Sequence, residues 1–345
     1  MTASDDDITA LDATALSEAV HARRVSCREV MQAYLARIAR FNPTYNAIVS
    51  LRPDDELLAE ADTCDAELAR GASRGWLHGA PQAIKDLANA AGLPTTLGSP
   101  LMKHFIAPED GLMAARMKGA GCIVIGKTNV PEFGLGSHTF NEVFGATFNA
   151  YDVTKSAGGS SGGAAVALAL GLLPVADGSD LMGSLRNPAA WNNVFGMRPS
   201  QGRVPMWPAQ DVWVSQLATE GPMGRSVRDV ARLLRTQAGW SPNTPLSIAS
   251  GADQTSAGGT FDFKSERIGW LGDLNGYLAM EPGILDACAS GLQRLQALGC
   301  AVEPARLGMA PERVWDAWLV WRRVLVASRI APFFLQPTNR VQIKH

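Results

Sequence analysis

Histidine is scarce in this chain, and its distribution argues against one common catalytic arrangement. There are five histidines among 345 residues, and only His345, the last residue, follows Ser184. The pattern G-x-S-x-G occurs twice in the run Gly158–Gly163, with Ser160 or Ser161 at its centre. In α/β-hydrolases the serine of this pattern is followed along the chain by an acid and then by a histidine. The sequence therefore disfavours a Ser-His-Asp triad built on this run.

Cysteine is also sparse, and no two cysteines have the spacing of a metal or redox motif. Their odd number argues against a disulfide framework. The five positions are Cys27, Cys64, Cys122, Cys288 and Cys300. The predicted location is therefore a reducing compartment, the cytoplasm, and the sequence predicts neither a metal ion nor a cofactor.

Neither charge nor hydrophobic length indicates binding to nucleic acid or to a membrane. The net charge is −2 and the charged residues are scattered. The longest nearly uninterrupted apolar stretch, residues 164–176, contains Pro174 and is too short to span a bilayer. The acidic first seven residues lack the apolar region of a signal peptide, so we expect none. The predicted partner is a small molecule, and a homodimer is left open.

Helical periodicity alternates with short apolar strands along most of the chain. Ser26 and Glu29 form a capping box before an apolar helical face, which we expect to end at Asn42-Pro43. Further helices are predicted at 53–71, 110–118, 164–172, 282–298 and 311–330 and after Ser226, and strands at 122–125, near Val175, at 268–271 and at Val302. This alternation predicts an α/β fold with a mostly parallel or mixed sheet.

The chain is interpreted as one domain, 1–345, in three parts. Residues 1–75 form a helical segment, residues 76–235 form the core, and residues 236–345 form an α/β extension. Residues 240–265 are polar and rich in glycine and serine, which predicts an excursion on the surface.

One nucleotide-binding motif is present in letters only. Gly121-x4-Gly126-Lys127-Thr128 matches the P-loop pattern, which requires a loop whose amides face phosphate. Here the four intervening residues are Cys-Ile-Val-Ile, which is typical of an apolar strand. The context therefore disfavours nucleotide binding.

Two further segments contain residue types suited to hydrolysis. The run Gly158–Gly163 could be a flexible linker, but an apolar helix follows it directly, which favours an anion or oxyanion site at a helix start. Lys85 could be a solvated lysine paired with Asp86. Its neighbours Ala83, Ile84 and Leu87 instead indicate a buried strand end, where desolvation favours the neutral amine.

Seven ordered blocks between residues 10 and 235 resemble the amidase signature family of serine hydrolases, which includes the A subunit of the tRNA-dependent amidotransferase. The blocks are His78–Asp86, Thr95–Ser99, Gly126–Phe133, Phe144–Asn149, Gly158–Gly163, Gly178–Arg186 and Gly221–Val227. The resemblance implies an α/β fold with a mixed sheet flanked by helices on both faces. Members usually continue well past the end of this chain, so we expect it to lack the family's usual C-terminal portion.

The family pattern also implies roles for individual residues. It makes Lys85 the base, Ser160 a bridging serine preceded by a cis peptide bond, and Ser184 the nucleophile. The oxyanion hole would consist of the amides of Leu181, Met182, Gly183 and Ser184, and the supporting residues would be Ser161, Asp180 and Arg186.

The implied reaction is hydrolysis of the C–N bond of a linear amide. Neutral Lys85 would take a proton from Ser160, which would take one from Ser184 as that residue attacks the amide carbon. Because free lysine has a pKa of about 10.4, a lysine base predicts an alkaline activity optimum.

The chain departs from the family pattern at two positions in the site. Met182 replaces a usual glycine, so it is either strained by a positive φ or narrows the acyl pocket. Ala157 replaces a common proline before the glycine–serine run. The candidate pocket walls, which would suit an apolar or aryl acyl group, are Phe133, Phe144, Met182, Trp191, Trp207 and Trp213.

The sequence is also compatible with other functions. The chain could be a non-catalytic or partner-dependent subunit, similar to the A subunit of the amidotransferase, or it could be a truncated inactive form. The presence of all three implied catalytic residues favours the amidase.

Overall fold

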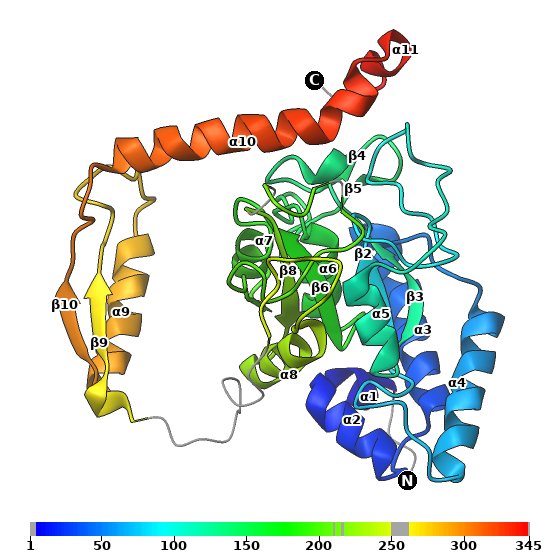
Figure 1. The fold of residues 1–345 in the computed structure, drawn as a ribbon. Coiled ribbons are helices and arrows are strands. Elements are labelled where there is room, and N and C mark those ends of the chain that lie inside the picture. Colours follow the sequence, from blue (N-terminus) through cyan, green and yellow to red (C-terminus); the bar gives the residue numbers. More distant parts are fainter. Residues whose placement is uncertain (1–4, 210, 215–216, 250–261, 344–345) are drawn as a thin grey trace. The chain divides into compact units, whose positions relative to one another are not determined.

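The computed structural model describes residues 5–209, 211–214, 217–249 and 262–343, without the side chains of residues 5–7. The chain forms two compact units, of which the first comprises Met1–Ala257 with Gln336–His345 and the second comprises Gly258–Leu335. The sequence places the start of its last part at residue 236, earlier than this division. Figure 1 shows the ribbon coloured along the chain.

The first unit begins with helices that pack around one long helix. These helices are α1 (Asp5–Ala10), α2 (Ala13–His21), α3 (Cys27–Tyr45) and α4 (Asp54–Ala69). The predicted capping box at the start of α3 is confirmed, because Ser26 accepts a hydrogen bond from the Glu29 amide while the Glu29 carboxylate accepts one from the Ser26 amide. The predicted end of this helix at Pro43 is wrong.

Pro43 lies in the last turn of α3, where a missing N–H removes only one helical hydrogen bond. The helix ends at Asn46, which has a left-handed conformation. The Asn42 side chain accepts hydrogen bonds from the amides of Ala47 and Ile48 just beyond it. These contacts lead the chain directly into the strand β1 (Ile48–Val49).

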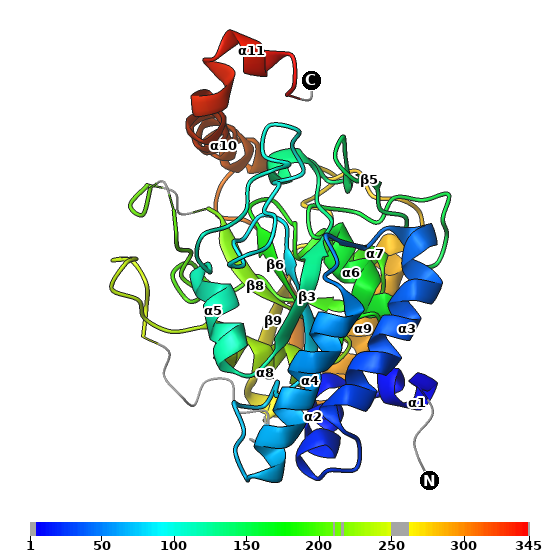
Figure 2. The ribbon, with the colours of Figure 1, turned by 90° about the vertical axis from the view of Figure 1, so that its right-hand side faces the viewer.

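Two groups of strands form the centre of the first unit (Figure 2). In one, β3 (Ile123–Thr128) pairs in parallel with β2 (Pro81–Lys85) and antiparallel with β1. In the other, β8 (Thr219–Gly224) lies antiparallel between β6 (Val175–Asp180) and β7 (Phe195–Gly196). The two groups lie side by side through β2 and β6, which confirms the predicted mixed sheet.

Alternating side chains of these strands pack against helices on both faces of the sheet. The remaining elements of this unit are α5 (Leu112–Gly119), η1 (Glu132–Gly134), β4 (Phe140–Asn141), β5 (Gly145–Ala146), α6 (Gly162–Ala169), α7 (Arg186–Trp191), α8 (Val227–Gln237) and α11 (Pro337–Arg340). Ala83 and Ile125 join the cluster of α3 and α6, whereas Ile84 and Val124 join that of α5 and α8. This period of two is typical of a strand buried on both sides.

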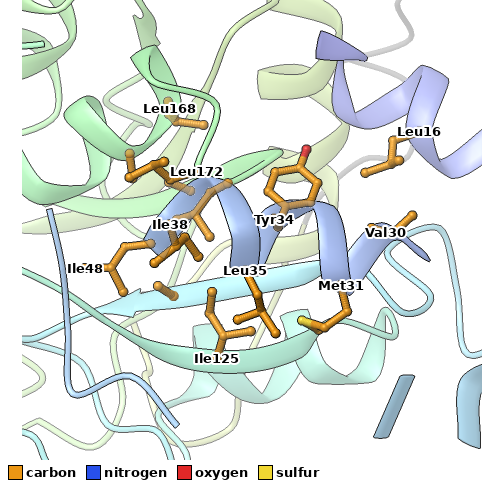
Figure 3. Close-up of a cluster of buried hydrophobic side chains, with 14 of the residues drawn as sticks. Leu16, Val30, Met31, Tyr34, Leu35, Ile38, Ile48, Ile125, Leu168 and Leu172 are labelled. Atoms are coloured by element: carbon orange, nitrogen blue, oxygen red, sulfur yellow. The ribbon is translucent and has the colours of Figure 1, made fainter. Parts of the chain in front are cut away.

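The larger core cluster is centred on α3 (Figure 3). Tyr34 and Ile38 of this helix lie on the side of Leu168 and Leu172, and Leu35 lies close to Ile125 of β3. The glycine–serine run Gly158–Gly163 leads directly into α6, which belongs to this core. The core therefore fixes the position of the run.

The second unit is a small α/β layer. It contains η2 (Phe263–Ser265), β9 (Arg267–Trp270), α9 (Ile284–Ala297), β10 (Ala301–Pro304) and α10 (Pro311–Phe334). Strands β9 and β10 are parallel and are connected through α9. These elements correspond to the predicted helices and strands, and the predicted surface excursion at 240–265 lies in part outside the described residues. No helix in the described ranges is long and apolar enough to cross a membrane.

Candidate active site

Lys85 is the last residue of β2, and its side chain is buried, with 1% of its surface exposed. Its amine lies within hydrogen-bond distance of the hydroxyl oxygens of Ser160 at 2.8 Å, Ser161 at 2.7 Å and Ser179 at 3.0 Å. It also lies 3.3 Å from the Ser179 carbonyl oxygen. The structure thus brings together three residues of the predicted site and adds Ser179, which sequence reasoning did not assign.

The glycine–serine run reaches Lys85 through a tight turn at the start of α6. The peptide bond between Gly159 and Ser160 is cis, as the resemblance implies. Thr139 donates a hydrogen bond to the Gly158 carbonyl and accepts one from the Gly162 amide. A Cβ on Gly162 would lie 2.2 Å from the Thr139 hydroxyl oxygen. Only glycine fits there, so the run is a built turn and not a flexible linker.

Ser184 lies in the loop between β6 and α7, next to the glycine–serine run. It is buried, and its carbonyl oxygen accepts a hydrogen bond from the Ser161 amide at 3.2 Å. Gly183 before it has a φ of +107°, which only glycine adopts without strain. The two serine loops are therefore joined through their backbones.

Asp180 organises the Ser184 loop from the end of β6. Its carboxylate accepts hydrogen bonds from the amides of Gly183 at 2.7 Å and Leu185 at 3.2 Å, and from Arg186 at 3.0 Å. Arg198 forms a further ion pair at 3.4 Å. Burial acts to raise the pKa of Asp180, but these hydrogen-bond donors hold the pKa below its ordinary value.

The predicted oxyanion hole requires one correction. The Gly183 amide donates its hydrogen bond to Asp180, whereas the prediction has it donate to the oxyanion. In the part of the chain that the structure describes, the amides of Leu181, Met182 and Ser184 donate to no protein acceptor. Met182 does not adopt a positive φ, and its side chain is 43% exposed. Of the two expectations for Met182, backbone strain is therefore excluded.

Two buried carboxyl groups lie beside the site, and sequence reasoning missed both. Asp177 in β6 accepts a hydrogen bond from the Lys85 amide at 3.0 Å, and burial raises its pKa. Glu220 in β8 is also buried, and burial, with Asp177 next, raises its pKa to about 8 against the opposing charge of Lys85. Neither strand is apolar enough in sequence, VADGSD for β6 and TEGPMG for β8, to mark these acids as buried.

The predicted pocket walls are divided in the structure. Phe133 is buried and Phe144 is half-buried, whereas the other four candidates are exposed: Met182, Trp191, Trp207 and Trp213. A Cβ placed on Gly158 would lie 3.3 Å from the Trp191 ring. Met182 and Trp191 are thus the two candidates that lie at the serine loops.

Lys127 lies in a strand, as the apolar residues before it indicate, and not in a P-loop. Residues Ile123–Thr128 form β3, and the Lys127 side chain is fully buried. Its amine donates to the Thr95 hydroxyl at 3.2 Å and to the Ala88 carbonyl, and lies 3.8 Å from Asp86. This lysine therefore belongs to a buried polar network.

Within the described residues, one group of side chains has the composition of a metal site. It consists of Cys64, Glu67 and His78. However, His78 accepts a hydrogen bond from the Arg74 amide and faces the Cys64 carbonyl with its other nitrogen, while Glu67 pairs with Arg74. Both ring nitrogens of His78 and the carboxylate of Glu67 therefore already have partners within the protein.

Comparisons with known proteins agree with this geometry. The sequence model of the Amidase family matches residues 29–329. The chain belongs to this family, the amidase signature enzymes. It is similar in structure to a bacterial aryl acylamidase of the amidase signature family, with a TM-score of 0.87 and 30% identity over 97% of this chain and 70% of that one. A peptide amidase from Stenotrophomonas maltophilia gives a TM-score of 0.73 at 32% identity, covering 86% and 62% of the two chains.

Curated relatives are similar in sequence to the same part of the chain. The A subunit of glutamyl-tRNA(Gln) amidotransferase from Corynebacterium jeikeium is 34% identical over 299 residues, which is 86% of this chain and 60% of the relative. The corresponding protein from Pseudomonas fluorescens is 37% identical over 285 residues, or 83% and 58%. The chain therefore spans about 60% of the length of these relatives.

Proposed function

We propose that this protein hydrolyses the C–N bond of a small linear carboxamide through an acyl-enzyme on Ser184. The observation that carries the proposal is the 2.8 Å contact between the buried Lys85 amine and the Ser160 hydroxyl. A serine hydroxyl is a weak nucleophile until a base takes its proton. The cluster supplies a base and two serine loops in one buried place.

The proposed reaction begins with attack by the Ser184 oxygen on the amide carbon. The Ser184 proton passes to Ser160, whose own proton passes to neutral Lys85, and a C–O bond forms. When the tetrahedral intermediate collapses, the C–N bond breaks and the reversed relay delivers the proton to the leaving amine. Water then repeats the attack on the acyl-enzyme and regenerates Ser184.

The intermediate requires donors for its negative oxygen, and the Ser184 loop offers them. We assign this role to the amides of Leu181, Met182 and Ser184, while Asp180 engages Gly183 and fixes the loop. Preorganised amides stabilise developing charge because they need no reorganisation during the reaction. Ser161 and Arg186 are proposed to support the two loops.

The acyl group is proposed to be apolar or aryl. Met182 and Trp191 are 43% and 47% exposed beside the serine loops, which suits contact with an apolar ligand. The similarity to an aryl acylamidase and to a peptide amidase supports a linear amide as substrate. Cytoplasmic location and homodimer formation stay predictions of the sequence.

A second candidate is a partner-dependent component of a larger enzyme. The curated relatives named as the A subunit of the amidotransferase favour it. A chain of this kind would need other proteins for its complete reaction. Amide hydrolysis by the purified chain alone distinguishes the two candidates.

The test is labelling by a fluorophosphonate together with hydrolysis of aryl anilides. Wild type should be labelled and should release aniline, with a rate that rises toward alkaline pH. Ser184→Ala should do neither, while Ser200→Ala, at an exposed serine, should match wild type. Absence of labelling in wild type would favour the partner-dependent or inactive form, and a rate that peaks near pH 5 would contradict a lysine base.

A further inference from the structure

Glu220 lies on the same face of the sheet as the Lys85 amine. It is directly opposite Ser179 in the antiparallel pair of β6 and β8, and opposite residues in such a pair extend their side chains to the same face. The Ser179 hydroxyl accepts a hydrogen bond from the Lys85 amine at 3.0 Å. Strand register therefore brings the Glu220 carboxyl group to the neighbourhood of Lys85.

The surroundings of Glu220 favour its neutral form. The residue is 8% exposed, and its carboxyl group forms no hydrogen bond with any residue in the described ranges. A buried carboxylate without donors is unfavourable, so its pKa rises to about 8. The positive charge of Lys85 opposes this rise in the pKa of Glu220, as expected for two groups on the same face of the sheet.

Among the charged groups packed around β8, Lys85 is the cation that acts on Glu220. Asp177 on β6 is the other group with an effect, and it has the same sign as Glu220. The remaining charges have other partners: Asp180 with Arg186 and Arg198, Asp86 with Lys127, and Asp229 of α8 with the amides of Ala13 and Thr14. Each of these groups is neutralised or hydrogen-bonded where it lies.

We propose that Glu220 is a positioning residue that controls the charge of Lys85. Its carboxyl group keeps its proton at neutral pH, and when it ionises in the alkaline range the carboxylate favours the ammonium form of Lys85. Glu220 and Lys85 then share one proton, and only the arrangement with the proton on Glu220 leaves a neutral amine. This inference rests on the proposed function for the role of Lys85 as base.

The first test is the pH dependence of kcat/KM for wild type, Glu220→Gln and Glu18→Gln, the last at an exposed glutamate of α2. Without the carboxylate, Lys85 loses its proton at lower pH. The rising limb of the Glu220→Gln profile should move to lower pH by about one unit. At a given pH on that limb, the rate of the variant as a fraction of its own plateau should therefore be about tenfold higher than that of wild type. Glu18→Gln should follow wild type. A uniform loss of rate with an unmoved limb would overturn the proposal.

The second test does not require activity. Infrared difference spectra between wild type and Glu220→Gln, recorded from pH 6 to pH 10, should show a protonated-carboxyl band of wild type that disappears with a midpoint near pH 8, while any band of the buried Asp177 cancels. Absence of this difference band at neutral pH would overturn the proposal. If wild type shows no hydrolysis that depends on Ser184, the proposed function is wrong. The infrared band still decides in that case whether Glu220 holds a proton.

Discussion

The Lys85 amine lies 2.8 Å from the Ser160 hydroxyl oxygen, although 75 positions separate them in the chain. An ammonium group has three N–H bonds and no lone pair, whereas a neutral amine donates two hydrogen bonds and accepts a third. Ser161 and Ser179 can take the two donations of a neutral amine. Ser160 can then donate its proton to the amine, as the proposed relay requires.

Replacement of Lys85 by methionine should lower kcat by about 10²–10⁴-fold, the usual contribution of a positioned base. Methionine has a similar length and fills the buried space, so the thermal unfolding temperature should change little. Anilide hydrolysis and a thermal melt measure the two effects. Lys103→Met, at an exposed lysine, is the control, and comparable activity in Lys85→Met would exclude this lysine as the base.

Asp180→Asn should reduce both stability and catalysis. Asp180 is buried but Arg186 is 57% exposed, so loss of the carboxylate leaves no buried unpaired charge and should lower the free energy of unfolding by about 1–3 kcal/mol. Displacement of the loop amides can lower kcat by about 10²-fold. Because the folded pKa of Asp180 is depressed, its stabilisation is present above the ordinary aspartate pKa and is lost as the pH falls. Urea unfolding should therefore show a smaller difference between variant and wild type below about pH 3.9.

Asp316→Asn, at an exposed aspartate of α10, is the control for Asp180→Asn. It should leave stability and kcat near wild type. If Asp180→Asn also leaves kcat unchanged, this carboxylate does not fix the Ser184 loop.

Gly183→Ala should inactivate the enzyme with a moderate loss of stability. Gly183 has a φ of +107°, and a Cβ there would lie 2.7 Å from the Asn187 side chain. A side chain in this conformation should lower the free energy of unfolding by at least about 1 kcal/mol and displace the oxyanion amides. Gly119→Ala in α5, where a Cβ meets nothing within 4 Å, should retain activity. Equal activity of the two variants would contradict the assigned hole.

Glu220→Gln should change the pH dependence of stability even if activity is unaffected. Glu220 binds its proton more tightly in the folded protein, with a pKa of about 8. The contribution of Glu220 to the free energy of unfolding is therefore fully present below the ordinary glutamate pKa of about 4.3. This contribution, a few kcal/mol, is lost as the pH rises through about 8. Urea unfolding at pH 5 and pH 8.5 should show wild type losing more stability than the variant over this range. Parallel losses would show that Glu220 has an ordinary pKa.

Much of this site could be predicted because its residues lie in contiguous blocks. Ser160 and Ser161 stand in the glycine–serine run, Asp180 and Ser184 in the next block, and Lys85 in an apolar strand end. Local rules also predicted the start of α3 through its capping box. The end of α3 was missed because Pro43 is tolerated in a last turn that Asn46 closes.

Glu220 and Asp177 could not be assigned because their positions depend on non-local pairing. A shift of one residue in the register of β6 and β8 would turn Glu220 away from Ser179 and Lys85. The sequence alone does not determine that register, nor the packing of β2 beside β6 that leads the Asp177 carboxylate to the Lys85 amide. Burial, which raises the pKa of both acids, follows from the same packing.

The most direct test of the proposed chemistry is the identity of the serine that forms the covalent adduct. Three hydroxyls, those of Ser160, Ser161 and Ser179, contact Lys85, yet the nucleophile is proposed to be Ser184, one step further along the relay. Mass spectrometry of peptides from fluorophosphonate-treated wild type should place the adduct on Ser184, and Lys85→Met should reduce its rate of formation. An adduct on Ser160 or Ser161, or a rate independent of Lys85, would contradict the proposed mechanism.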